Sequence, residues 1–363
     1  MHANNKKLVI ITNARFWQAG AGYWARTRAT IMYLANQFDL TVIFNDPFDD
    51  RELSQVRKLQ PSLNFQWIGN QACDTVEHRQ QALRALLARQ PTADLYLVDK
   101  TKNAYLVDCL PEKATKLLDT HDIIHQRNKN MRQQGLKDDF ALTARQERKI
   151  FSQFDAIICI QEEDYKLVSQ WQPDYTCLLV PHPIKPMPQT LRERASRIGI
   201  IASGWHANVH GLNHFIDTIW AQIQRDDITL HIYGYVTNAF MHLDQPAIIR
   251  HGFQPKLADC YNNLDIIINP VKYGAGLKIK TIEAMAYGIP LVTTKEGASG
   301  LTHLSNKAFQ MACNDQQFID QINLLLNNSE KRKQLSKFAT DYVQQNMSEA
   351  QCFSPLTEFI RKS

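Results

Sequence analysis

The chain has 363 residues, of which 44% are hydrophobic and 21% charged. These are the proportions of a globular protein long enough to form two domains with full cores. Its net charge of +5 is mild and does not by itself indicate nucleic-acid binding, so we expect no nucleic-acid partner. No segment approaches the roughly 18 consecutive apolar residues that a membrane span needs.

The cysteines indicate a reducing compartment. Seven of them are scattered along the chain without a C-x-x-C pair, and several lie in apolar strand-like runs. Reduced cysteines of this kind are typical core residues of a cytosolic protein. The start of the chain leads into only a short apolar run, which is not the pattern of a signal peptide. We therefore expect a cytoplasmic protein. The cysteines are Cys73, Cys109, Cys159, Cys177, Cys260, Cys313 and Cys352.

The first half of the chain alternates strand-like and helix-like segments. Apolar runs predict strands at Leu8–Thr12, Leu40–Phe44, Asn64–Ile68, Leu95–Val98, Lys116–Leu118, Ala156–Ile160 and Cys177–Val180. Helical patterns fall between them at Trp24–Gln37, Val76–Gln90, Phe140–Gln153 and Asp164–Gln170. The segment 181–188 then holds four prolines, which continue neither kind of element and indicate a stiff linker between domains.

The same alternation restarts after the prolines. Strands are predicted at Ile198–Ala202, Thr229–Tyr233, Ile248–Arg250, Asp265–Asn269, Leu291–Thr293 and Phe309–Met311, and helices at Val209–Gln224, Lys256–Asn263, Lys278–Tyr287, Gln316–Leu326, Glu330–Gln345 and Glu349–Lys362. Repeated β-α-β units imply right-handed crossovers and a mostly parallel sheet. Two such halves predict an α/β protein with two Rossmann-like, doubly wound domains. Ligands would then bind at the carboxyl ends of the strands, in the cleft between the domains.

The most informative segment is Asp265–Pro290, DIIINPVKYGAGLKIKTIEAMAYGIP, which combines a buried strand, a glycine loop and a helix. The run Gly274-Ala275-Gly276 allows a sharp turn and a close approach of the backbone to a ligand. The helix that follows ends at Gly288. Its free N–H groups and positive dipole end point into the crevice above the strand, which favours an anion and most naturally a phosphate.

Three charged residues in the following helix also indicate a phosphate-containing ligand. Lys278 and Lys280 lie in the first helical turn, where cations oppose the helix dipole, so we expect a negative ligand near them. Glu283 is placed further along, where it suits a ribose hydroxyl. Together they predict a nucleoside diphosphate site. The alternative stays open from spacing alone, because strand–glycine–helix turns are common and Lys280 and Glu283 also fit a solvated i,i+3 pair.

Two further clusters fall where ligands are expected. The loop after the first strand carries Gly20 and Gly22 and leads into a helix with two arginines, which fits an anion or sugar site or an ordinary turn. His121 and Asp122 follow a later strand, where a carboxylate can tune an imidazole, or where Asp122 can cap a helix. Arg127, Lys129, Arg132 and Lys137 form a basic stretch that is typical of a solvated face or of contact with an anionic membrane.

The chain lacks the sequence patterns of a metal site. No D-x-D occurs, and no His or Cys spacing suggests zinc. We therefore expect no metal and no other cofactor.

The run Glu283-Ala284-Met285-Ala286-Tyr287-Gly288-Ile289-Pro290 resembles the donor-sugar motif of GT-B glycosyltransferases in the large retaining group called family 4 (glycosyl transferases group 1). Many members have a second glutamate eight positions earlier, where this chain has Ala275. The chain is similar instead to a subgroup with a GxGxKxK loop. A Gly-Arg motif and a following lysine, usual at the start of the second domain, are replaced by Trp205 and Asn208.

The resemblance covers essentially the whole chain and implies a GT-B fold with three parts. These are an acceptor-binding domain at 1–184, a nucleotide-sugar-binding domain at 185–348 and a C-terminal helix at 349–363 that crosses back to the first domain. It assigns catalysis to His121, Asp122 and Lys278. It assigns donor binding to Gly20, Gly22, Trp205, Asn208, Tyr273, Gly274, Ala275, Gly276, Lys280 and Glu283.

The implied function is a retaining hexosyltransferase that uses a nucleoside diphosphate sugar and a glycan or lipid-linked acceptor. The subgroup often serves bacterial surface polysaccharide synthesis, at the inner face of the cell membrane. Two alternatives stay open at this point. One is a nucleotide-sugar epimerase or hydrolase with the same domains, and the other is a non-catalytic GT-B binding module. The missing glutamate and the missing Gly-Arg and lysine pair favour the last, whereas Glu283 and His121 oppose it.

Overall fold

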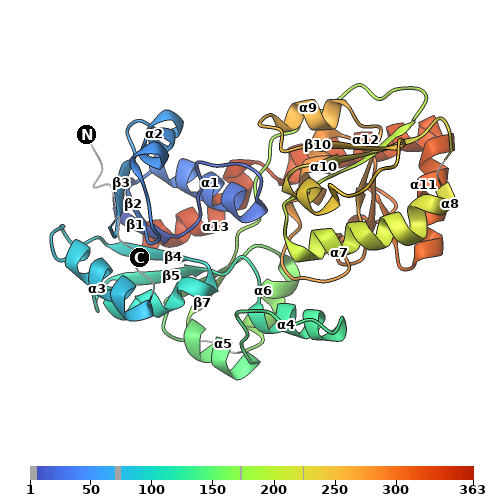
Figure 1. Cartoon of the computed structure of the whole chain (residues 1–363). Helices are drawn as coiled ribbons and strands as arrows, with labels where there is room; N and C mark the ends of the chain where they lie inside the picture. Colours follow the sequence, from blue (N-terminus) through green and yellow to red (C-terminus); the bar gives the residue numbers. More distant parts are fainter. Residues whose placement is uncertain (1–5, 70–74, 172–173, 224) are drawn as a thin grey trace.

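The computed structural model describes residues 6–69, 75–171, 174–223 and 225–363 and contains two parallel sheets, one in each half of the chain (Figure 1). The first has the strand order β3-β2-β1-β4-β5-β6-β7 and the second β10-β9-β8-β11-β12-β13. The predicted α/β class with two doubly wound sheets is therefore confirmed. The predicted Gln224 and Cys73 lie outside the described residues.

The strands agree with the apolar runs to within two residues at either end. They are β1 (Lys7–Thr12), β2 (Asp39–Phe44), β3 (Asn64–Trp67), β4 (Leu95–Asp99), β5 (Thr115–Asp119), β6 (Ala156–Cys159), β7 (Thr176–Leu179), β8 (Arg197–Ile201), β9 (Thr229–Tyr233), β10 (Ile248–Gly252), β11 (Ile266–Asn269), β12 (Leu291–Thr294) and β13 (Gln310–Ala312). Each sheet buries apolar side chains on both faces, as parallel sheets do. In β1, for example, Leu8 and Ile10 join one core cluster, and Val9 and Ile11 join another.

The α-helices cover both faces of the sheets. They are α1 (Gly22–Ala35), α2 (Asp50–Leu59), α3 (Val76–Leu87), α4 (Ile124–Gln133), α5 (Ala144–Phe151), α6 (Glu162–Ser169), α7 (His206–His214), α8 (Ala221–Ile223), α9 (Leu257–Asn262), α10 (Ile279–Tyr287), α11 (Asp315–Asn327), α12 (Ser329–Asn346) and α13 (Glu349–Lys362). Short 3₁₀ segments add η1 (Thr101–Cys109), η3 (Tyr235–Phe240) and η4 (Thr302–Leu304), and a π-helical turn, η2 (Phe215–Trp220), joins α7 to α8. Within the described residues, no helix is long and apolar enough to cross a bilayer.

Several helices differ from the sequence predictions. Helices α2 and α4 and the 3₁₀ segment η1 were not predicted; each is only nine or ten residues long, so its apolar pattern spans few turns. Helix α5 begins four residues later than predicted, since Thr143 and Gln146 form a reciprocal capping box that fixes its start. The helix predicted from Val209 begins at His206 and widens into the π-helical turn.

The last helix belongs to the core of the first half. Helix α13 lies beside α1 in Figure 1, although more than 300 residues separate them in sequence. Its side chains Phe353, Leu356 and Ile360 are fully buried in the core cluster that contains Leu8 and Ile10. The ring of Phe353 stacks on Tyr33 of α1, with 4.6 Å between ring centroids. The chain end thus ties the two halves together.

The two sheets place their ligand-binding edges toward one another. In the first sheet the strand order reverses between β1 and β4, and in the second between β8 and β11. Such switch points leave a crevice at the carboxyl ends of the strands. The loops that follow these four strands supply residues to a single cavity, described below.

We predict that Phe353→Ala destabilises the protein by about 3–5 kcal/mol, because it removes a buried aromatic ring and leaves a cavity. Melting temperature and urea unfolding measure the effect. The matched control is Phe338→Ala on α12, whose side chain is 39% exposed and should change stability by less than about 0.5 kcal/mol. Equal melting of Phe353→Ala and the control would mean that α13 is not part of the core.

Candidate active site

A cavity of about 600 Å³ lies between the two halves of the chain. Its volume falls in the range of about 300–1,000 Å³ that is usual for small-molecule sites. The loop around Gly20, the end of β4 and the loop after β5 line it from the first half. The loop after β8 and the segment 275–283 line it from the second half.

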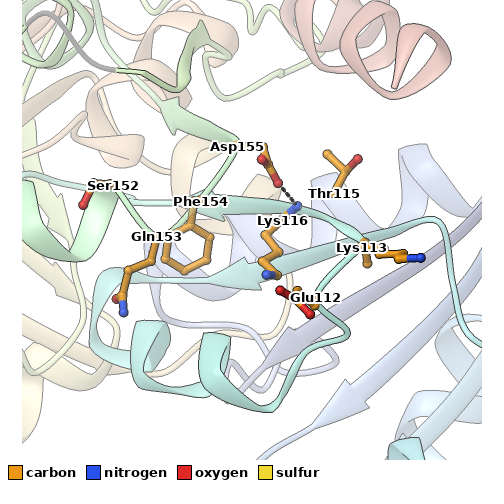
Figure 2. Close-up of a pocket in the computed structure, with 9 residues that line it drawn as sticks. Glu112, Lys113, Thr115, Lys116, Ser152, Gln153, Phe154 and Asp155 are labelled. Carbon is orange, nitrogen blue, oxygen red and sulfur yellow. Dashed lines mark hydrogen bonds between the residues drawn. The ribbon is translucent and has the colours of Figure 1, made fainter.

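A second, smaller hollow of about 220 Å³ lies elsewhere (Figure 2). It sits where β5 and β6 begin, at the opposite edge of the first sheet. The carboxylate of Asp155 there accepts a hydrogen bond from the backbone N–H of Lys116 at 2.7 Å. Open parallel sheets bind ligands at the carboxyl ends of their strands, so we assign the chemistry to the larger cavity.

Glycines bring the loop before α10 close to the first half. Gly274 and Gly276 have φ angles of 143° and 68°, which strain other residues. A Cβ atom at Gly276 would lie 2.6 Å from the backbone oxygen of His121. The carbonyl of Gly274 accepts a hydrogen bond from Asn130 of α4 at 2.8 Å. The loop therefore closes one side of the cleft, and its backbone leaves no room for side chains at these positions.

The two lysines of this loop have different surroundings. Lys278 is buried, and its Nζ donates to the backbone oxygens of Ala275 and Gly276 and lies 2.7 Å from a carboxylate oxygen of Glu296. Glu296, which follows β12, thus balances its charge, while the two backbone contacts hold the loop together. The ammonium group of Lys280 donates instead to the side-chain oxygen of Asn208.

In the part of the chain that the structure describes, Lys280 has no direct carboxylate partner. Within the described residues, no carboxylate oxygen lies within 4 Å of its Nζ. Burial, together with the charge of Lys278, lowers the pKa of Lys280 to about 7. A buried ammonium without a counter-ion is costly. An anion in the cavity would therefore be stabilised here, next to the first turn of α10.

Glu283 lies one helical turn after Lys280 and also lines the cavity. One of its carboxylate oxygens accepts a hydrogen bond from the hydroxyl of Tyr261 at 3.3 Å. Burial raises the pKa of Glu283 to about 7. Its other oxygen has no hydrogen bond within the described residues, so it is available to hydroxyl groups of a ligand.

His121 faces these residues from the first half. It follows β5 with a φ angle of 60°, an unusual conformation for a residue other than glycine. Its Nε2 lies 2.7 Å from a carboxylate oxygen of Asp99, which also accepts a hydrogen bond from Thr12 at 2.6 Å. Burial acts to raise the pKa of Asp99, but the charge and hydrogen bond of His121 outweigh it, and the net effect lowers the pKa. Asp99 thus fixes the imidazole and leaves Nδ1 for a ligand.

Asp99, the partner of His121, is a residue that the sequence did not single out. The carboxylate expected beside His121 was Asp122, but its two oxygens accept hydrogen bonds from Arg127 at 3.1 and 2.8 Å. Arg127 also bonds Asp138 at 2.6 Å. The signal for Asp99 was its position directly after the predicted strand Leu95–Val98, where polar residues reach the cleft.

The first glycine loop packs against the second half. Gly20 has a φ angle of 105°, and a Cβ atom there would lie 2.6 Å from the ring of Tyr235. That ring stacks on Phe253, with 4.9 Å between centroids and an angle of 10°. Both rings are partly exposed, at 42% and 37%. Phe253 lines the cavity, whereas Tyr235 stacks on it from outside the lining.

The two arginines after this loop have structural partners. Arg26 is buried and lies 3.1 Å from the carboxylate of Asp119, and Arg28 donates to the backbone oxygens of Phe16 and Gln18. Asp99, Asp119 and His121 are the one group within the described residues whose ligand atoms lie close enough together for a metal ion, within 4.8 Å. In this group His121 already bonds Asp99, and Arg26 neutralises Asp119.

Most of the residues predicted to act in the site line the cavity, and three of them do not. Trp205 and Asn208 contribute from the start of α7. Tyr273, Gly274 and Gly276 do not line the cavity, and the hydroxyl of Tyr273 bonds Nδ1 of His206 at 2.9 Å. The roles assigned to these residues stay predictions. The predicted residues that line the cavity are Gly20, Gly22, His121, Asp122, Trp205, Asn208, Ala275, Lys278, Lys280 and Glu283.

Comparison with known proteins agrees with this architecture. Residues 195–328 match the family described as Glycosyl transferases group 1. No curated protein matches the chain in sequence. Solved structures match it over its full length at low sequence identity, and such likeness shows the fold.

Three similar structures illustrate the match. Sucrose-phosphate synthase from Thermosynechococcus elongatus is 13% identical, with a TM-score of 0.75 and 98% of each chain covered. HepE from Anabaena, solved with UDP and glucose, is 13% identical with a TM-score of 0.73, covering 99% of this chain and 100% of that one. The pneumococcal O-GlcNAc transferase GtfA, solved with UDP and GlcNAc, is 9% identical with a TM-score of 0.75 and 99% coverage of both.

The family match, the two facing sheets and the cavity between them lead to one conclusion. The chain has the GT-B fold of solved glycosyltransferases, and its residues 195–328 match the group 1 glycosyl transferases.

Proposed function

We propose that the protein is a retaining transferase that moves a hexose from a nucleoside diphosphate sugar to a hydroxyl of a glycan or lipid-linked acceptor. The main support is the pair Lys280 and Glu283. An ammonium without a counter-ion and a carboxylate with a free oxygen lie one helical turn apart and line one cavity with His121. A diphosphate and its ribose present the matching anion and hydroxyl groups.

The donor fits along the wall formed by the second half. Its diphosphate binds Lys280 and the N-terminal turn of α10, where the helix dipole favours negative charge. Its ribose hydroxyls donate to Glu283. The ring of Phe253, which lines the cavity and stacks on Tyr235, offers a flat apolar surface for the nucleobase. Because HepE and GtfA were each solved with UDP, uridine nucleotides are the first donors to test.

The chemistry depends on stabilising the leaving group. As the bond between the sugar C1 and the phosphate oxygen breaks, negative charge grows on the diphosphate, and Lys280 and backbone N–H groups stabilise it in place of a metal ion. The acceptor oxygen forms the new bond to C1 on the same face, so the configuration is retained. The acceptor proton passes to the departing phosphate oxygen. His121, held by Asp99, positions the sugar.

The acceptor binds the first half and is a component of a bacterial surface polysaccharide. Lys129, Arg132 and Lys137, on α4 and just after it, are exposed. These side chains would bring the enzyme to the anionic inner face of the membrane, where lipid-linked acceptors are found. This peripheral contact is part of the proposal.

We predict that Glu283→Gln weakens nucleotide binding about tenfold or more, because a hydrogen bond to a charged group contributes about 1.5–3 kcal/mol. Wild-type affinity should also fall as the pH drops below about 7, since protonation removes the carboxylate. The nucleotide affinity of the variant should not fall in this acidic range, because glutamine has no carboxylate to protonate. Calorimetric titration with UDP, GDP and ADP from pH 5.5 to 8.5 measures both effects, with Glu330→Gln on the surface of α12 as control. Unchanged affinity would reject the ribose assignment.

We predict that Lys280→Met lowers turnover much more than it lowers the melting temperature, because it removes charge stabilisation expressed in the transition state. In the wild type, diphosphate affinity should fall by up to about tenfold per pH unit above pH 7, where Lys280 loses its proton. Lys278→Met should instead lower the melting temperature, because it removes the hydrogen bonds from Lys278 to the backbone of the loop before α10. Normal turnover in Lys280→Met would assign the phosphates to another group.

We predict that turnover does not require a divalent metal. Activity measured in EDTA should match activity measured with added magnesium or manganese, because Lys280 and the helix N-terminus supply the positive charge that a metal would otherwise provide. Loss of turnover in EDTA that manganese restores would contradict this directly.

A further inference from the structure

Lys100 is held in a strained backbone conformation at the edge of the cavity. It follows β4 directly, with φ 73° and ψ 137°. This region is sparsely populated by residues with a side chain, and such conformations persist where the surrounding structure enforces them, often at ligand sites. The backbone N–H of Lys100 donates to the backbone oxygen of Asp119 at 2.8 Å, which fixes the conformation. Glycine would relieve the strain, yet the chain has a lysine here.

The charge of Lys100 is not paired directly, although the carboxylates of Asp99, Asp46 and Asp122 act on it from a distance within the described residues. Its Nζ lies 4.5 Å from the ring centroid of Tyr23, and no carboxylate oxygen lies within 4 Å of it. The neighbouring Asp99 is occupied by His121, Thr12 and Thr27. Burial lowers the pKa of Lys100. An anion in the cavity would offset this cost.

The residues next to Lys100 favour an anion as well. The hydroxyl of Thr101 is buried, lines the same cavity and has no hydrogen-bond partner within the described residues. Lys102 adds a second positive charge and also lines the cavity. All three residues lie where η1 begins, and the N-terminal N–H groups of a helix add partial positive charge. A hydroxyl donor and two ammonium groups match a phosphate or a carboxylate.

We propose that Lys100, Thr101 and Lys102 bind an anionic group, a phosphate or a carboxylate, on the acceptor. The inference rests on the proposed transferase function, which it extends to the chemical class of the acceptor. The three residues belong to the first half of the chain, whereas the residues assigned to the donor diphosphate, Lys280 and the start of α10, belong to the second. His121 belongs to the same half as Lys100, so an acceptor anchored here would place a hydroxyl near the reacting sugar.

Phosphate and acetate serve as probes, because they carry the two candidate groups without a sugar. The protein is first saturated with whichever of UDP, GDP and ADP binds, so that the donor phosphate site is filled. Calorimetric titration then measures inorganic phosphate and acetate binding. The wild-type protein should bind one of the two probes at a single site. The probe that binds shows whether the site takes a phosphate or a carboxylate. Lys100→Met should weaken that binding about tenfold or more, and Lys100→Arg should retain it.

Two controls separate a ligand-binding role from a structural one. Lys113→Met, at an exposed lysine outside the cavity, should bind the probe as wild type does. Lys100→Gly should melt at the wild-type temperature or above it, because glycine relieves the backbone strain. The same variant should no longer bind the probe. Nucleotide affinity should be unchanged in every Lys100 variant.

The outcomes distinguish this inference from the proposed function. Equal probe binding in wild type and Lys100→Met, or no binding of either probe in wild type, would overturn the anionic acceptor site while nucleotide binding stands. Absence of nucleotide binding would instead reject the proposed function, and the probes would then be titrated into free protein. A loss of nucleotide affinity in Lys100→Met would reassign Lys100 to the donor.

Discussion

The close approach of two backbones across the cleft is the constraint on which the site depends. A Cβ atom at Gly276 would fall 2.6 Å from the backbone oxygen of His121, and one at Gly20 would fall 2.6 Å from the ring of Tyr235. Such distances leave no room for a side chain. The glycines therefore set how near the two sheets come, and the size of the cavity follows from that approach.

Some of the cations around the cavity are paired with a carboxylate and others are not. Arg26, Arg127 and Lys278 each lie against a carboxylate, which balances their charge. Lys280 and Lys100, one from each half of the chain, have no carboxylate partner within the described residues. Under the functions proposed above, Lys280 serves the donor diphosphate and Lys100 serves an anionic group of the acceptor. Burial lowers the pKa of both lysines, which expresses the cost of holding their charge without a ligand.

The backbone strain falls in the same place. His121 and Lys100 are two of the three described residues other than glycine with a positive φ angle, and both lie directly beyond the ends of neighbouring strands. The hydrogen bond from Lys100 to Asp119, together with the contact between His121 and Asp99, links the two loops. The first half of the chain therefore stores strain at two residues that line the cavity, as is often found where geometry is set by function rather than by stability.

Sequence by itself determined the fold class, the strands and the motif around Glu283, because buried parallel strands are continuous apolar runs and a glycine loop before a helix is a local pattern. It also predicted Lys280, Glu283 and His121 as site residues that line the cavity. Only the tertiary structure decided which charges are free. Lys278 and Lys280 look alike in sequence, but a glutamate 18 residues away neutralises the first and an amide 72 residues away bonds the second. The partner of His121 is likewise Asp99 and not the adjacent Asp122. Pairing of charges depends on contacts between distant strands and loops, which no local pattern records.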